Sequence, residues 1–200
     1  TAKKRYILNV WDSEGVRYTE PKLKIMGIEA VKSSTPAVCR KKIKEALKII
    51  MTQTEEDLIE FVAKFKSEFY EMPPEDVAFP RGVNGLTKWS DPVTLYRKSC
   101  PINVRGALVY NHQLKKHNLT YKYPLIQEGE KIKYLYLKTP NTVGQNVISF
   151  ISNFPTEVNV HKNIDYKLQF QKSFLDPLKI ILDTIGWKTE KQSDLMSLFS

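Results

Sequence analysis

Residues 33–69 read SSTPAVCRKKIKEALKIIMTQTEEDLIEFVAKFKSEF, and this stretch decides the fold class. Thr35 is the predicted N-cap of a helix, with Pro36 at the first helical position. A second helix start follows at Thr54, where acidic residues favour the positive end of the helix dipole. The apolar residues that recur at helical spacing in the two segments are Cys39, Ile43, Ala46, Leu47 and Ile50, then Leu58, Phe61, Val62, Phe65 and Phe69. The short polar connection predicts two antiparallel neighbouring helices.

Upstream of these helices, the sequence predicts a β-hairpin over residues 5–19. Side chains alternate in character along residues 6–11, and residues 12–15 supply turn residues that end on a glycine. Residues 23–27 predict one further short extended segment. Strands followed by helices indicate an α+β fold.

Downstream of residue 70 the pattern is mixed. Prolines and glycines make residues 71–101 irregular. The elements predicted next are a helix over residues 102–118 and strands over residues 131–138 and 147–151. A last helical region covers residues 163–185, where Pro177 predicts a kink or two consecutive helices. Gly186 predicts a left-handed end to that region.

The formal net charge of the 200 residues is +9, and the charge is segregated along the chain. Lys and Arg outnumber Asp and Glu by twelve to five in residues 1–50 and by eleven to three in residues 81–140, whereas acids lead by eight to two in residues 51–80. Such segregation predicts one basic face and a polyanionic partner. No apolar run is long enough to span a bilayer. Cys39 and Cys100 are predicted to be small buried side chains of a reducing compartment, because no metal-ligand spacing recurs.

Two short stretches have the chemistry of a phosphate contact. Residues 3–6 read Lys-Lys-Arg-Tyr, and strand alternation places Lys4 and Tyr6 on one face and Lys3 and Arg5 on the other. Such cations neutralise phosphate and can reach minor-groove acceptors. The hydroxyls at residues 33–35 could bind an anion at a helix start. The alternatives that stay open are a solvated strand end and an ordinary capped helix.

Taken together and in order, these residues resemble the family B replicative DNA polymerases, in particular those of T-even-type bacteriophages. The likeness rests on Lys-Lys-Arg-Tyr at 3–6, Lys-Ile-Met-Gly-Ile-Glu at 24–29, Ser-Ser-Thr-Pro at 33–36, Cys-Pro-Ile-Asn-Val-Arg-Gly-Ala-Leu-Val-Tyr at 100–110, residues 129–131 and 170–174, and the last residues. The resemblance implies a palm edge over residues 1–30, a mainly helical thumb with a short β insertion over 31–187, and a flexible tail over 188–200. Because the chain starts at Thr1, we expect a C-terminal piece of a larger protein.

The resemblance also implies contacts to primer–template duplex. The residues that it marks are Lys3, Lys4, Arg5, Tyr6, Ser33, Ser34, Thr35, Arg105 and Tyr110. Lys131, Lys133 and Lys138 join them from charge and strand position alone. The expected function is a grip on duplex DNA without sequence preference.

The C-terminal residues predict a second partner. Residues 192–199 fit Gln-x-x-apolar-x-x-apolar-aromatic, the pattern of peptides that dock on a sliding clamp. The docking residues would be Gln192, Leu195, Leu198 and Phe199, although clamp peptides often have an aromatic residue where Leu198 stands. A tail that packs on its own domain is the open alternative.

No Asp-Thr-Asp motif occurs in the chain, so we expect no catalytic residue, metal ligand or cofactor in this piece and no polymerase activity from it alone. Two magnesium ions are expected upstream, in an intact DNA-directed polymerase that is a nucleotidyltransferase. The expected partners are primer–template duplex, the sliding clamp and the rest of the polymerase, without a membrane, in the cytoplasm of the infected bacterial host. A clamp-binding adaptor that touches no DNA, or a complete small enzyme, are the alternatives.

Overall fold

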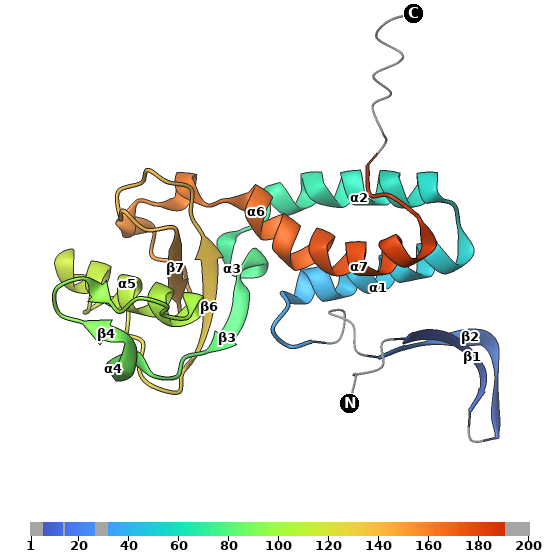
Figure 1. The fold of residues 1–200 in the computed structure, drawn as a ribbon, viewed down its shortest axis with the longest axis horizontal. Coiled ribbons are helices and arrows are strands. Elements are labelled where there is room, and N and C mark those ends of the chain that lie inside the picture. The colour runs from blue at the N-terminus through green and yellow to red at the C-terminus, as the bar shows by residue number, and fades with distance from the viewer. Residues whose placement is uncertain (1–5, 14, 27–31, 191–200) are drawn as a thin grey trace, which may run out of the picture.

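The structure is a computed structural model that describes residues 6–13, 15–26 and 32–190. It confirms the α+β class: long helices lie beside small antiparallel sheets (Figure 1). One buried apolar cluster runs through both the helical part and the three-stranded sheet. The chain boundaries predicted for palm edge, thumb and tail stay predictions.

The N-terminal hairpin is present and longer than expected. Strand β1 (Tyr6–Ser13) pairs antiparallel with β2 (Val16–Met26), from Tyr6 opposite Met26 to Ser13 opposite Val16. Gly15 has φ of +81°, the left-handed conformation that the tight turn requires. Residues 23–26 are extended, as predicted, and they continue β2 and pair with the start of β1, so the hairpin is longer than the predicted residues 5–19.

Four helical segments pack together as the helical part of the molecule (Figure 1). They are α1 (Ala37–Thr52), α2 (Glu55–Tyr70), α6 (Tyr166–Phe170) and α7 (Asp176–Ile185). The predicted helix pair and its buried stripes are confirmed, except that Ile50 and Phe61 are only partly buried. Phe65 packs on Phe174 with ring centroids 4.8 Å apart, which joins α2 to the C-terminal segment.

Pro177 explains how the C-terminal helices are divided. A π-helical turn (Gln171–Leu175) separates α6 from α7, and Pro177 lies in the first turn of α7. Proline has no N–H to donate and its ring collides with the carbonyl four residues back, so a wider turn accommodates it. Gly186 then ends α7 with φ of +73°. Both predictions for this region are confirmed.

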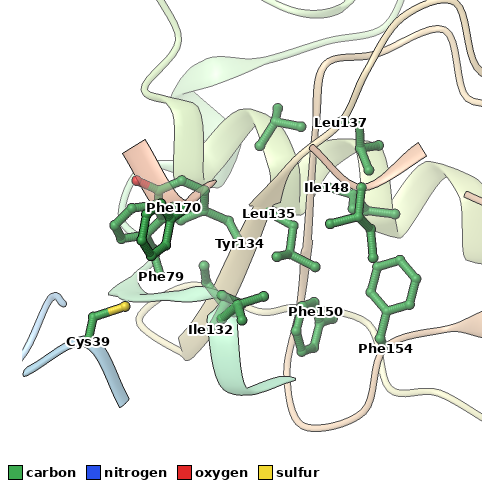
Figure 2. Close-up of a cluster of buried hydrophobic side chains, with 14 of the residues drawn as sticks. Cys39, Phe79, Ile132, Tyr134, Leu135, Leu137, Ile148, Phe150, Phe154 and Phe170 are labelled. Atoms are coloured by element: carbon green, nitrogen blue, oxygen red, sulfur yellow. The ribbon is translucent and has the colours of Figure 1, made fainter. Parts of the chain in front are cut away.

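The second part of the molecule is a sheet with the order β3–β6–β7, covered by α5. Its elements are β3 (Phe79–Gly82), α5 (Ile102–Lys116), β6 (Lys131–Tyr136) and β7 (Val147–Phe150). All strand pairs are antiparallel. In Figure 2, Phe79, Tyr134 and Phe170 come together, so this core continues into the helical part.

The stretch expected to be irregular contains several short elements. They are α3 (Pro74–Val77), β3, α4 (Leu86–Trp89), β4 (Ser90–Asp91) and β5 (Leu95–Tyr96). Two short 3₁₀ turns, Thr156–Val158 and His161–Asn163, connect β7 to α6. The sequence predicted the loops here but not the edge strand β3.

Candidate nucleic-acid interface

The start of α1 differs from the predicted cap. The Arg40 N–H donates the first helical hydrogen bond to the Pro36 carbonyl, so Pro36 and not Thr35 occupies the N-cap position, and no side chain caps the helix. Thr35 is only 5% exposed. Ser33 is exposed and Ser34 half-buried. Of the three hydroxyls predicted to meet phosphate, those of the two serines therefore have the surface to do so.

Helix α1 carries a row of exposed cations that the sequence analysis did not select. Lys41, Lys44 and Lys48, here called the α1 lysine row, lie three and four residues apart on the face opposite the buried stripe. Within residues 6–13, 15–26 and 32–190, none of the three forms an ion pair. Lys42, by contrast, lies 3.2 Å from the Glu68 carboxylate. The helical spacing alone could have revealed this row.

The length of the α1 lysine row suits a nucleic-acid backbone. Seven residues of α-helix rise about 10 Å, at about 1.5 Å per residue. Phosphates on one strand of B-form DNA follow at about 3.4 Å along the axis, so the row spans about three of them. The arrangement can therefore neutralise several successive phosphates without reading a base.

In helix α5, the charged group of Arg105 contacts other residues of the protein. The Arg105 Nη2 donates to the Asn146 Oδ1 at 2.9 Å, and its guanidinium lies over the Tyr96 ring, 5.6 Å from the centroid. The Arg105 Nε is buried without a partner among the described residues. The resemblance implied that Arg105 contacts DNA, and nothing in the fold tests that role. Because its charged group is engaged with Asn146 and Tyr96, we expect its substitution to affect stability rather than duplex binding.

Tyr110, also predicted on the binding side, lies in the core. It is 1% exposed, its hydroxyl donates to the Pro124 carbonyl at 3.2 Å, and burial raises its pKa to about 12. A residue enclosed in this way offers no surface to a duplex. Its hydroxyl is held by the connection between α5 and β6, and this burial corrects the placement that the resemblance implied.

Gly106 shows why residues 100–110 are constrained. A Cβ built at Gly106 would lie 3.0 Å from the Ser149 backbone nitrogen and closer still to the Ser149 hydroxyl. That hydroxyl donates to the Asn103 carbonyl at 3.0 Å, and the Asn103 amide donates to the Gly82 carbonyl at 2.8 Å. Much of this motif therefore fastens α5 to β7 and β3.

The three lysines predicted along one strand have different surroundings. Strand β6 ends at Tyr136, so Lys138 lies beyond it. Lys131 is exposed at its start, opposite Gly82. The Lys133 ammonium donates to the Glu75 carbonyl at 2.8 Å and is half-buried.

Lys138 instead borders a hollow next to α6. The hollow has a volume of about 650 Å³ and is named here the α2–α6 hollow. Its lining residues are Tyr70, Glu71, Met72, Pro73, Pro74, Lys138, His161, Lys162, Ile164, Tyr166 and Lys167. Three of them are lysines, and Glu71 is the acid among them.

Several predicted contacts lie outside the described residues. They are Lys3, Lys4 and Arg5 near the start, and Gln192, Leu195, Leu198 and Phe199 near the end. For Tyr6 the structure gives the backbone position, at the beginning of β1. These predictions stay as the sequence left them.

The described residues contain no group of three or more His, Cys, Asp or Glu side chains that could hold a metal ion. Cys39 is buried, its thiol donates to the Ser173 hydroxyl at 3.3 Å, and burial raises its pKa to about 12. Such a thiol is a packing group. Cys100 is half-buried.

Comparison with known proteins shows which family this chain is similar to. The chain is 36% identical over 205 residues to a DNA-directed DNA polymerase of Escherichia phage RB69, a match that covers 100% of the chain. It is 33% identical over 202 residues to a DNA-directed DNA polymerase of Enterobacteria phage T4, over 99% of the chain. The chain is a segment of the T4-type DNA polymerases. It spans about 22% of the length of these curated relatives. No family model matches the chain.

The resemblance inferred from the motifs is thus confirmed. In this T4-type polymerase segment, α1 and the α2–α6 hollow each carry three exposed lysines, and further exposed cations lie elsewhere on the described residues. The contacts of Gly106 and Arg105 on α5 are with the protein itself. Among the described residues, no helix is long and apolar enough to cross a membrane.

Proposed function

We propose that this chain serves a DNA-directed DNA polymerase, a nucleotidyltransferase, by gripping primer–template duplex without sequence preference. The match of the whole chain to two phage DNA polymerases carries the proposal. On this proposal the chain works together with the rest of the polymerase in the cytoplasm of the infected bacterial host. Its own part is binding, and the reaction belongs to residues elsewhere in the polymerase.

The α1 lysine row is the best support for a grip by phosphate neutralisation. Its three ammonium groups are exposed, are not paired with acids in the described part of the chain, and follow one another at roughly phosphate spacing. The exposed Ser33 hydroxyl lies just ahead of the same helix. Contacts of this kind position a duplex and carry no base information.

We further propose that the chain tethers the polymerase to a sliding clamp through residues 192–199. The support is the sequence pattern of Gln192, Leu195, Leu198 and Phe199. Deleting residues 192–200 should abolish clamp binding and leave duplex affinity intact. Retention of clamp binding by the shortened chain would refute the tether, and loss of duplex binding would refute the division of labour.

The grip is tested by the salt dependence of duplex binding. A labelled primer–template duplex is titrated with the chain at several salt concentrations and followed by fluorescence anisotropy. Dissociation constants on the order of 10⁻⁴ to 10⁻⁶ M are expected near physiological salt, with a log–log slope of about −0.9 per phosphate contact. A salt-independent affinity, or no binding at low salt, would refute the grip. Two duplexes of different sequence should bind alike.

A further inference from the structure

We propose that the α2–α6 hollow binds single-stranded nucleic acid, with phosphates on Lys162, Lys167 and Lys138 and a base against Tyr70. The inference deepens the proposed function and rests on it in one respect, that the partner of this chain is nucleic acid. It adds a second kind of strand, bound at a different place from the α1 lysine row.

The hollow is built by bonds between segments that are distant in sequence. Leu137 forms a β-bridge with Ile164, and the Lys138 N–H donates to the Asn163 carbonyl at 2.7 Å, so the two segments run side by side. On the opposite side, the Tyr166 hydroxyl donates to the Met72 carbonyl at 2.7 Å. One wall is thus joined to the residues just ahead of α6 and the other to α6 itself, so the recess is a fixed part of the fold.

The charge around the hollow favours an anion. Lys138, Lys162 and Lys167 are exposed, and none forms an ion pair within the described part of the chain. Glu71 also lines the hollow, and Asp165 raises the pKa of Tyr70 as the lesser cause after burial. The Asp165 carboxylate is engaged, because it accepts from the Leu168 N–H at 2.9 Å. The lysines therefore outnumber the acids at the rim.

The aromatic residues and the size of the hollow favour a single strand over a duplex. Tyr70 is 37% exposed, and its ring lies 6.2 Å from that of Tyr166 and 6.4 Å from that of Phe170. An exposed ring held from behind is a platform on which a base can stack. A volume of about 650 Å³ is that of a ligand-sized recess. It admits a nucleotide of a single strand and not a base-paired helix.

The test compares two variants with equal loss of charge. Lys162 and Lys167 are changed to alanine together, and Lys64 and Lys179, exposed on α2 and α7, serve as the matched control. A labelled oligothymidylate of about eight nucleotides is the single-strand probe. A primer–template duplex with the same label is the second probe, and each is titrated at several salt concentrations.

The hollow variant should lower the salt slope for the single strand by about 1.4, at about 0.7 per phosphate contact, and leave duplex binding unchanged. Tyr70→Leu, which keeps apolar contact with Phe170, should weaken single-strand binding about tenfold without changing the slope. The control variant, Lys64→Ala with Lys179→Ala, should bind both probes with the affinity and salt slope of the wild-type chain. This pattern would support the proposal.

Three results would overturn it. The first is an unchanged salt slope for the single strand in the hollow variant, and the second is an equal decrease of that slope in the control variant. The third is an equal decrease of the slope for the single strand and the duplex in the hollow variant. Tighter binding of polyglutamate than of the oligonucleotide would show a protein partner instead and would also overturn it. Failure of the duplex grip is a separate result, in which the wild-type chain binds the single strand and not the duplex.

Discussion

Helices α1 and α5 begin alike, and their cations have different surroundings. Each starts after a proline in the N-cap position, with φ of −52° and ψ of 140° at Pro36 and −55° and 141° at Pro101, and neither has a side-chain cap. In α1 the lysine row points away from the core. In α5, Arg105 lies against Asn146 and Tyr96. The surroundings differ because α5 packs closely on the sheet, whereas the face of α1 opposite its buried stripe is exposed.

Close packing on a sheet is what turns the α5 motif inward. Gly106 lets α5 approach β7, so its neighbour Arg105 reaches the residue just before that strand. Helix α1 packs through one stripe on α2 and the C-terminal segment, and its opposite face stays exposed. A basic residue in a recognisable motif can therefore have a structural role instead of contacting DNA. The predictions below test this contrast.

The largest expected loss of stability comes from adding a side chain where α5 packs closely on β7. Gly106→Ala should lower the free energy of unfolding by about 1–3 kcal/mol, because a Cβ there meets the Ser149 backbone and cannot be accommodated by side-chain rotation alone. Denaturant unfolding measures the change. Gly82→Ala is the control, since a Cβ there meets no heavy atom within 4 Å. Equal stability of the two variants would contradict the account of α5.

A smaller loss is expected from the cation itself. Arg105→Ala should destabilise the chain by about 1 kcal/mol, through the lost Asn146 hydrogen bond and the lost contact with Tyr96. Lys98→Ala, which removes an exposed charge nearby in sequence, should stay within about 0.5 kcal/mol of wild type. A double-mutant cycle with Asn146→Ala measures the pair directly. A zero coupling energy would show that the bond contributes nothing.

The start of α2 offers a contrast in pH dependence. There Thr54 and Asp57 form a capping box, and the Thr54 backbone N–H, then its hydroxyl, lower the pKa of Asp57. A lowered folded-state pKa stabilises the fold above the unfolded value of about 3.9, and that contribution disappears as the pH falls through the folded value.

Thr54→Ala should therefore destabilise the chain at pH 7, and the difference from wild type should shrink in acid. Thermal unfolding between pH 7 and pH 2 tests this. A difference that is constant with pH would mean that the Thr54 hydroxyl does not stabilise the ionised carboxylate of Asp57. Neither α1 nor α5 has an acid in its first turn, so neither start can supply the effect.

The smallest expected effect on stability belongs to the α1 lysine row. Changing Lys41, Lys44 and Lys48 to alanine together should leave the free energy of unfolding within about 0.5 kcal/mol of wild type. The three side chains are exposed and alanine is a good helix former. A loss as large as that of Gly106→Ala would show that these lysines support the fold after all. Unfolding of both variants under one set of conditions decides it.

Local signals predicted much of this fold. Thr54 and its acids mark the start of α2, Pro177 divides the C-terminal helices, and Gly186 ends α7, because each acts on the backbone within one helical turn. Strand β3 escaped prediction because its four residues include Pro80. Proline is tolerated there only because β3 is at the edge of the sheet, where pairing with β6 holds it.

The candidate sites depend on contacts that no local pattern contains. The partner of Arg105 is 41 residues away, and only the fold shows that Tyr110 is buried. The α2–α6 hollow is lined by Tyr70, Lys138 and Lys167, whose segments are held together by a β-bridge and two hydrogen bonds. Helical spacing alone predicts the α1 lysine row, whereas the resemblance to the polymerase family implies the motif of α5 as the contact.

The most direct test of the contrast is the salt slope of duplex binding in two variants of the chain. Replacing Lys41, Lys44 and Lys48 with alanine should make the log–log slope shallower by about 2.7, at about 0.9 per lost phosphate contact, while Arg105→Ala should leave it as in wild type. A slope unchanged by the triple substitution, or lowered by the Arg105 substitution, would contradict the assignment of the grip to α1.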